Sequence, residues 1–203
     1  MTGTAARSDP ATAPEPLAAV QDFLNTLHVE RGTDELGDTR SAQTWLVRAG
    51  YHGSHQVSGD ELDQLRSLRG ALRDLVSTRE PTHAASGVTE DEGDDAGASP
   101  SVAERLARVA AAATYVPQVG ADGALRFRAG GDGVSGVIGM LVLALHDAQH
   151  EGTWRRLKIC RNDACAWAFY DYSRNHSGTW CAMGICGNRT KVARHRARRR
   201  QAD

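Results

Sequence analysis

All four cysteines of this 203-residue chain lie between positions 160 and 186, and the first 159 residues contain none. They form two pairs: four residues separate Cys160 from Cys165, fifteen lead to Cys181, and four more lead to Cys186. Zn²⁺ prefers four soft ligands in a tetrahedron, and two short cysteine-bearing turns can supply them from two sides. A segment of this kind has no core without the metal, so binding and folding would be coupled. The spacing therefore predicts one structural zinc ion held by these four thiolates.

Other uses of the four thiols are buried free cysteines or a redox pair, and His176 could replace one ligand. We favour the four-cysteine metal site, because residues 1–16 lack the apolar middle of a signal peptide. Thiols that stay in a reducing cytoplasm bind metals more often than they form disulfides. His176 falls in the polar turn of a β-hairpin that we expect between the two pairs, around residues 174–178, and this position disfavours it as a ligand.

Charge divides the chain into two unequal parts. Residues 151–203 hold twelve Lys and Arg against four Asp and Glu, whereas residues 1–150 hold twelve against twenty-one. The net charge of −1 thus combines +8 in the tail with −9 in the body. A basic tail behind an acidic body predicts a polyanion as the partner of the tail. Because no run of eighteen apolar residues exists, we expect no membrane span and a cytoplasmic protein, associated with the nucleoid if it binds DNA.

Helical periodicity dominates the body. Leucines at three- and four-residue spacing follow a Ser-x-x-Glu capping box at Ser58, and a second capping box begins at Ser101. In the first helix, Trp45, Leu46 and Ala49 should turn inward. We expect helices at residues 41–49, 59–79, 101–113 and 134–149, the last of them being the central core helix.

The remaining segments give weaker patterns. Residues 17–31 are compatible with a strand or a short helix, and residues 124–128 alternate as a strand does. Residues 1–16 have the composition of a disordered leader, and residues 81–100 predict an acidic mobile loop because they are poor in large apolar side chains. The expected fold class is α+β, with a mainly helical N-terminal domain at residues 17–153 and a small metal-binding domain at residues 154–200.

No catalytic set is supported by the sequence. Residues 131–136 match G-x-G-x-x-G, but no further βαβ units follow to build a dinucleotide crevice. The segment His146-Asp-Ala-Gln-His150 lacks the glutamate base of zinc proteases, and His28-Val-Glu30 lacks the Pro-Cys-x-x-Cys partner of zinc deaminases. A closed shell of four thiolates also leaves no open position for water activation. We therefore expect a protein that is not an enzyme.

Several motifs resemble two known families that occur together. Cys186-Gly-Asn-Arg189, with the Cys160–Cys165 pair, Asp171-Tyr-Ser-Arg-Asn175 and Trp180-Cys181, resembles the CGNR zinc-finger family. Asp22-Phe-Leu-Asn-Thr26 resembles the opening motif of the ABATE domain that accompanies this finger. The resemblance runs from about residue 17 to residue 196, and the acidic segment 84–99 is no part of it. It implies a treble-clef-like zinc finger behind an α+β domain, in a stress-induced transcription regulator, with Cys160, Cys165, Cys181 and Cys186 as ligands.

In a treble clef the second cysteine pair lies at the start of a helix. Gly187 would then allow a close backbone approach beside the metal, and Asn188 would cap the first turn. The helix would carry the basic run to the phosphates of a nucleic acid, which release counterions when they are neutralised. The candidate nucleic-acid-binding residues are Arg189, Lys191, Arg194, Arg196, Arg198 and Arg199.

The resemblance alone implies that the nucleic acid is DNA. The alternative is a zinc-stabilised interaction module whose basic helix docks an acidic protein and makes no contact with DNA. In either case the N-terminal domain would sense a small-molecule or protein effector.

Overall fold

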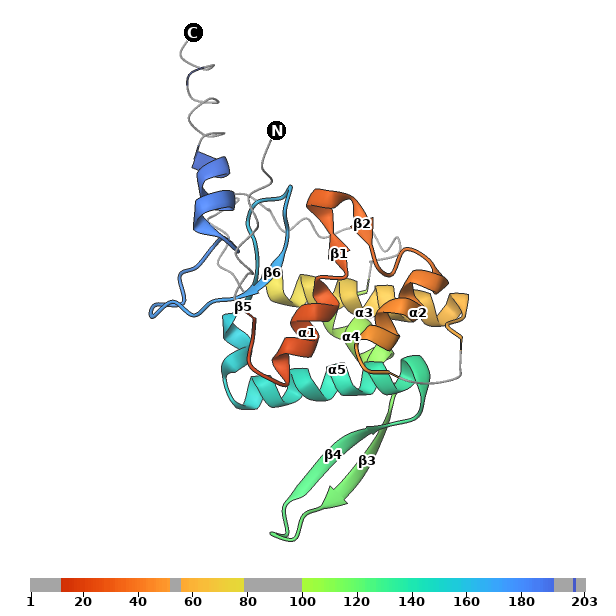
Figure 1. Cartoon of the computed structure of the whole chain (residues 1–203). Coiled ribbons are helices and arrows are strands. Elements are labelled where there is room, and N and C mark those ends of the chain that lie inside the picture. Colours follow the sequence, from red (N-terminus) through yellow and green to blue (C-terminus); the bar gives the residue numbers. More distant parts are fainter. Residues whose placement is uncertain (1–11, 52–55, 79–99, 192–198, 200–203) are drawn as a thin grey trace, which may run out of the picture.

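Packed helices form the body of the protein, seen in a computed structural model that describes residues 12–51, 56–78, 100–191 and 199 (Figure 1). Within these residues, no helix combines the length and the apolar character needed to cross a bilayer. The α-helices are α1 (Leu17–Leu24), α2 (Thr39–Arg48), α3 (Gly59–Thr78), α4 (Val102–Ala110) and α5 (Gly133–His150). The expected acidic loop lies outside the described residues apart from Pro100, and so does most of the expected leader.

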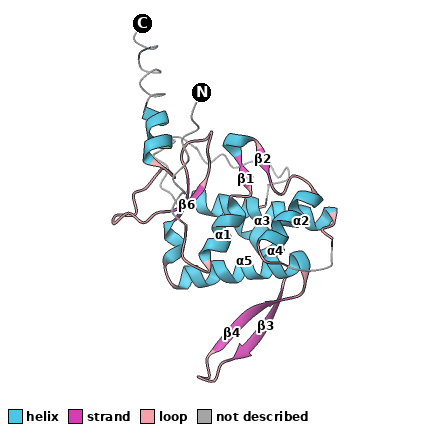
Figure 2. Ribbon diagram, in the orientation of Figure 1, coloured by secondary structure: helices cyan, strands magenta, loops and turns pink. Residues whose placement is uncertain are grey.

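Small antiparallel sheets connect the helices (Figure 2). Leu27–His28 (β1) pairs with Thr33–Asp34 (β2), and the single turn η1 (Val29–Arg31) joins them. The ribbon of β3 (Thr114–Val119) and β4 (Leu125–Gly130) projects away from the body. The third sheet pairs β5 (Leu157–Ile159), which follows the turn η2 (Thr153–Arg156), with β6 (Ala168–Tyr170). The expected mixture of helices with small sheets is confirmed.

Helices α3 and α4 begin where the capping patterns predict them, and α4 ends at Ala110, before the expected residue 113. The Ser58 backbone N–H donates to the Glu61 carboxylate (2.8 Å), and the Glu61 N–H donates to Ser58 Oγ (3.3 Å), which fixes the start of α3. The same reciprocal pair forms between Ser101 and Glu104 at α4. Residues 17–31, for which the pattern left two options, begin with a helix because Leu17, Val20, Phe23 and Leu24 are all fully buried along one face.

Helix α5 is the centre of the core, as expected, and glycines let it approach the ribbon. A Cβ on Gly136 would lie 2.8 Å from the Gly131 carbonyl oxygen, and one on Gly139 would lie 3.1 Å from Ala129 Cβ. Only glycine allows this approach without a shift of the neighbours. The N-terminal half of α5 is therefore held directly against the end of β4.

Three expectations from the sequence differ from the structure. Ala49 is exposed, and Ala42 takes the buried position in α2 beside Trp45 and Leu46. Strand β3 was not among the expected elements; it accommodates Pro117 because it lies at the edge of a two-stranded sheet. The predicted β-hairpin between the two cysteine pairs is wrong: β6 pairs with the preceding β5, so the first cysteine pair lies in the connection between those strands.

One hydrophobic core extends across residue 153, where the sequence suggested a domain boundary. Trp154, Leu157, Ala168 and Tyr170 are buried in the same cluster as the apolar faces of α1, α3 and α5. The β5–β6 hairpin is thus packed into the helical body. This arrangement places the cysteines beside the N-terminal half of the chain.

Candidate metal centre

The first cysteine pair is held by a tight turn between β5 and β6. The Cys160 N–H donates to the Trp167 carbonyl (2.9 Å), and the Cys165 N–H donates to the Asn162 carbonyl (2.7 Å). Ala166 closes the turn with a φ of 46°, a left-handed conformation uncommon for a residue with a Cβ. These backbone hydrogen bonds hold the main chain at both cysteines within one turn.

The second pair lies where the last helical segment begins. Cys186 is in the turn η3 (Met183–Gly187), which has π-helical hydrogen bonding, and α-helix continues through residues 188–191. A Cβ on Gly187 would lie 2.5 Å from Met183 Sδ and 3.2 Å from Trp180, so a larger residue there would displace the flexible Met183 side chain. The capping role predicted for Asn188 is wrong: it lies inside the helix, where its Nδ2 donates to the Gly184 carbonyl (3.0 Å).

The four sulfurs form a compact group that fits a tetrahedral metal ion. All four Sγ atoms lie within 4.8 Å of one another, and no histidine or carboxylate of the described residues joins the group, His176 included. Cys181 Sγ is 3.6 Å from Cys165 Sγ and 3.7 Å from Cys186 Sγ. Zn–S bonds of about 2.3 Å in a regular tetrahedron place sulfurs about 3.8 Å apart, whereas a disulfide requires about 2.05 Å. The arrangement can therefore hold a metal ion, and the cysteines are free thiols.

Electrostatics in the cluster favour a bound cation. Hydrogen bonding to Cys165 raises the pKa of Cys160 to about 11. Hydrogen bonds to Cys160 and Cys165 raise the pKa of Cys181, while donation from Cys160 lowers the pKa of Cys165. Of these three thiols, Cys165 thus ionises most readily, whereas Cys160 and Cys181 hold their protons more firmly because adjacent negative charges repel. A divalent cation would reverse this balance and allow all four to ionise.

A buried ion pair organises the loop that leads to Cys181. Lys158 Nζ donates to the Asp171 carboxylate (2.8 Å) and to the carbonyls of His176 (2.5 Å) and Gly178 (3.0 Å). Burial opposes ionisation of Asp171, but hydrogen bonds from Lys158 and from the N–H groups of Ser173 and Gly178 hold its pKa below the ordinary range. Lys158 of β5 therefore holds this loop in place. Asp171 has a structural role that the segment Asp171–Asn175 alone did not reveal.

Comparison with family models assigns both halves of the chain. The CGNR zinc-finger model matches residues 156–199. The ABATE model, described as "Putative stress-induced transcription regulator", matches residues 17–149, more than half of the chain. The chain belongs to the ABATE family. No curated protein matches it in a sequence comparison. The two matched segments follow one another in the order that the sequence motifs predicted.

The opening ABATE motif connects the body to the finger. Ala168 in β6 donates its N–H to Asn25 Oδ1 (2.8 Å), and Asn25 Nδ2 donates back to the Ala168 carbonyl (3.0 Å). Gln21 Nε2 reaches the same carbonyl at 3.3 Å. The Asn25 side chain thus pairs with both backbone groups of Ala168, on the edge of β6 that does not pair with β5. Within the motif, Asp22 also accepts from Trp45 Nε1 (3.0 Å).

Helix α3 of the ABATE domain makes a second connection. Arg73 donates to the Leu24 carbonyl at the end of α1 (3.1 Å) and to the Ala166 carbonyl in the cysteine turn (2.6 Å). The rings of His28 and Trp167 also meet, with centroids 4.8 Å apart. Sequence reasoning missed Asn25 and Arg73 as neighbours of the metal site, because neither residue type signals a partner more than ninety positions away.

The basic residues predicted to bind nucleic acid are only partly described. Arg189 forms an ion pair with Glu30 in η1 (2.5 Å), so the arginine of the CGNR motif contacts the ABATE domain. Lys191 is exposed at the end of the described helix, and Arg199 is exposed in a helical conformation. Arg194, Arg196 and Arg198 lie outside the described residues.

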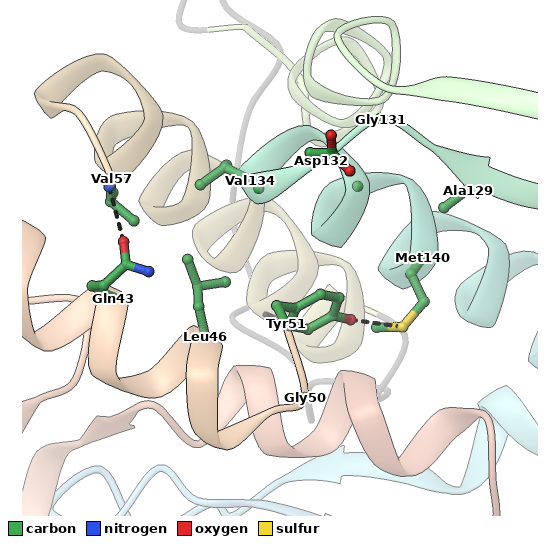
Figure 3. Close-up of a pocket in the computed structure, with 12 residues that line it drawn as sticks. Gln43, Leu46, Gly50, Tyr51, Val57, Ala129, Gly131, Asp132, Val134 and Met140 are labelled. Atoms are coloured by element: carbon green, nitrogen blue, oxygen red, sulfur yellow. Dashed lines mark hydrogen bonds between the residues drawn. The ribbon is translucent and has the colours of Figure 1, made fainter. Parts of the chain in front are cut away.

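The glycine motif at residues 131–136 lines a cavity of about 340 Å³ in the ABATE domain (Figure 3). Tyr51 projects toward it and donates its hydroxyl to Met140 Sδ (2.6 Å), and burial raises the pKa of Tyr51 to about 12. Gln43 Oε1 accepts from the Val57 N–H (3.0 Å) on another wall. The strand before the motif is antiparallel to its neighbour, so the surroundings are not those of a dinucleotide-binding βαβ unit.

Proposed function

We propose that this protein is a transcriptional regulator that binds DNA through the basic helix that follows a structural zinc site, and that it has no enzymatic activity. The observation that carries the proposal is the position of the cysteine cluster: Cys186 lies in the first turn of the helical segment that leads into the basic run. Zinc is the metal that best suits four thiolates in a tetrahedron. We further propose that the finger is of the treble-clef type, with Cys186 at the base of its helix.

Charge supports a nucleic acid as the partner. Residues 189–200 contain seven Lys and Arg and no Asp or Glu, and they continue from a helix that the metal would anchor. A rigid base with several cations can neutralise several phosphates at once, and the released counterions supply affinity. A closed shell of four sulfurs gives the metal no open position for a substrate, which supports a structural role.

A salt titration tests the proposal on the zinc-loaded full-length chain. Replacing Arg194, Arg196, Arg198 and Arg199 by Gln should weaken binding to duplex DNA almost equally for all sequences. The slope of log K against log salt should become shallower by up to about 0.9 for each phosphate that the variant no longer neutralises. The matched control removes the same charge from four exposed arginines of the ABATE domain, namely Arg31, Arg40, Arg108 and Arg128. The control should retain most of the slope.

Two results would reject DNA as the partner. An unchanged slope in the finger variant would mean that these arginines do not meet phosphates. Equal or tighter binding to an acidic polypeptide than to duplex DNA would favour the alternative, a zinc-stabilised module that docks an acidic protein.

We also propose that an effector of the ABATE domain is a small molecule that enters the cavity beside Tyr51. The cavity has the size of a small-ligand site, and it combines apolar walls with the Tyr51 hydroxyl and the Gln43 amide. A thermal-shift screen would test this, since a ligand at a hundred times its Kd stabilises the native state by about 2.7 kcal/mol. Tyr51→Ala should abolish the shift of any true ligand, whereas Tyr172→Ala, at a tyrosine that is 61% exposed, should retain it.

A further inference from the structure

The four cysteines of the candidate metal centre differ in exposure. Cys160, Cys165 and Cys186 are at most 3% exposed and share a small apolar core with Phe169. Cys181 is half-buried, so it is the member of the group that a solute can reach. Susceptibility of a thiolate to oxidation follows its accessibility and the presence of a second thiol nearby.

Cys181 lies in the connection between the β5–β6 hairpin and η3, where its backbone N–H donates to Cys160 Sγ. Cys160 and Cys165 are held in the β5–β6 turn by their N–H groups, and the Cys186 N–H donates to the Ala182 carbonyl (2.9 Å) within η3. Cys181 precedes η3 and belongs to no helix or strand. Its sulfur is nevertheless a neighbour of both Cys165 and Cys186, at 3.6 and 3.7 Å. A shift of less than about 2 Å would bring it to the sulfur–sulfur bond length of a disulfide.

From this asymmetry we propose that Cys181 is an oxidation site at which hydrogen peroxide opens the metal centre. The Cys181 thiolate attacks one peroxide oxygen, the O–O bond breaks, hydroxide leaves, and the sulfur becomes a sulfenic acid. The thiolate of Cys165 or Cys186 then attacks that sulfur, a disulfide forms, and a second hydroxide leaves. Two thiolates have lost two electrons, and both oxygens of the peroxide end as water after protonation. Two cysteines remain, too few to retain a metal of this kind.

The consequence would reach the basic helix and the ABATE domain. Without the metal, Cys186 is no longer linked to Cys160 and Cys165 in the β5–β6 turn. Arg189 and Lys191 then lose the metal as their anchor and keep the exposed Arg189–Glu30 ion pair. Asn25 and Arg73 would still bind the backbone of β6 and of the cysteine turn. We therefore expect oxidation to detach the basic helix and leave the helical body folded. The loss of DNA binding that follows rests on the proposed function, but the oxidation itself does not.

The test uses zinc-loaded full-length protein and hydrogen peroxide in increasing amounts. A chromogenic chelator follows zinc release, dimedone traps the sulfenic acid, and mass spectrometry maps adducts and disulfides after the free thiols are alkylated. We expect the dimedone adduct on Cys181, a first disulfide that includes Cys181, and one zinc released per disulfide. A thiol reductant with added zinc should reverse the change.

A control separates this route from oxidation of a nearby methionine, because Met183 is 61% exposed. Met183→Leu should release zinc at the same rate as the wild type. The proposal is overturned if the adduct forms first on Cys160, Cys165 or Cys186, if zinc leaves while Cys181 is still free, or if Met183→Leu prevents release. Retention of zinc at peroxide levels that oxidise a simple thiol would overturn it as well. If zinc release follows the expected course but the reduced protein binds no DNA, only the proposed function fails.

Discussion

Replacement of Asn25 by alanine should destabilise the finger and the body together. The substitution removes both hydrogen bonds to Ala168, a residue with no exposed surface, and leaves its N–H without the Asn25 oxygen. The carbonyl keeps the weaker hydrogen bond from Gln21. A buried group left unpaired costs about 1–3 kcal/mol, and removal of the second hydrogen bond places our expectation at about 2–3 kcal/mol. For a chain of this size, that decrease in stability lowers Tm by about 4–12 °C.

Two probes on the same sample make the Asn25 experiment decisive. Circular dichroism reports the helices of the body, and zinc release to a chelator reports the finger, so both transitions should move by the same amount. Asn175→Ala is the matched control, since Asn175 is exposed in the finger loop and its replacement should change stability by less than about 0.5 kcal/mol. A destabilisation below about 0.5 kcal/mol for Asn25→Ala would refute the reasoning. A shift confined to zinc release would refute the coupling between the two halves.

Three further substitutions test the metal site and its surroundings. Cys181→Ser should remove the one zinc expected per chain by elemental analysis, and zinc should leave the wild type as pH falls because protons compete for the thiolates. Asp171→Asn should cost about 3 kcal/mol in denaturant unfolding, because the buried Lys158 would lose its carboxylate partner. Since the pKa of Asp171 is lowered from 3.8, this stabilisation is present above that value, so the difference from the wild type should stay constant from about pH 8 to pH 5. Glu30→Gln removes the exposed ion pair with Arg189, so it should change stability by less than about 1 kcal/mol and steepen the salt dependence of DNA binding by up to about 0.9.

The sequence was most informative where side-chain chemistry or hydrophobic periodicity leaves few possible sites or secondary structures. Four thiols at fixed spacing have few uses other than a metal site, and the structure brings all four together. Leucines at helical spacing behind Ser58 predicted α3 almost to the residue, because capping and amphipathicity act over a few neighbouring positions. Local rules of this kind do not depend on the rest of the fold.

Contacts between positions far apart in the chain could not be predicted from residue spacing or capping patterns. Asn25 and Ala168 are 143 positions apart, and an asparagine in a loop is compatible with many partners. Strand β6, which follows the first cysteine pair, was assigned to the wrong hairpin because its pairing also depends on a distant interaction. It pairs with β5, and both strands bury side chains, Leu157 and Tyr170, in the core shared with the helices. Asn188 was expected to cap the last helical segment, but that segment begins with a π-helical turn whose N-cap is Ala182.

The hydrophobic core shared across residue 153 limits how such a protein can be rearranged by recombination. A breakpoint between the two matched families would separate Leu157, Ala168 and Tyr170 from the helices that cover them. The first product would be a helical body with an exposed apolar face. The second would be a finger in which the apolar side of β5 and β6 is exposed. Neither fragment could be transferred to an unrelated protein without new residues to replace the missing surface. The two halves should therefore be inherited as a pair, and a designer who wants the finger alone must first redesign the buried side of β5 and β6.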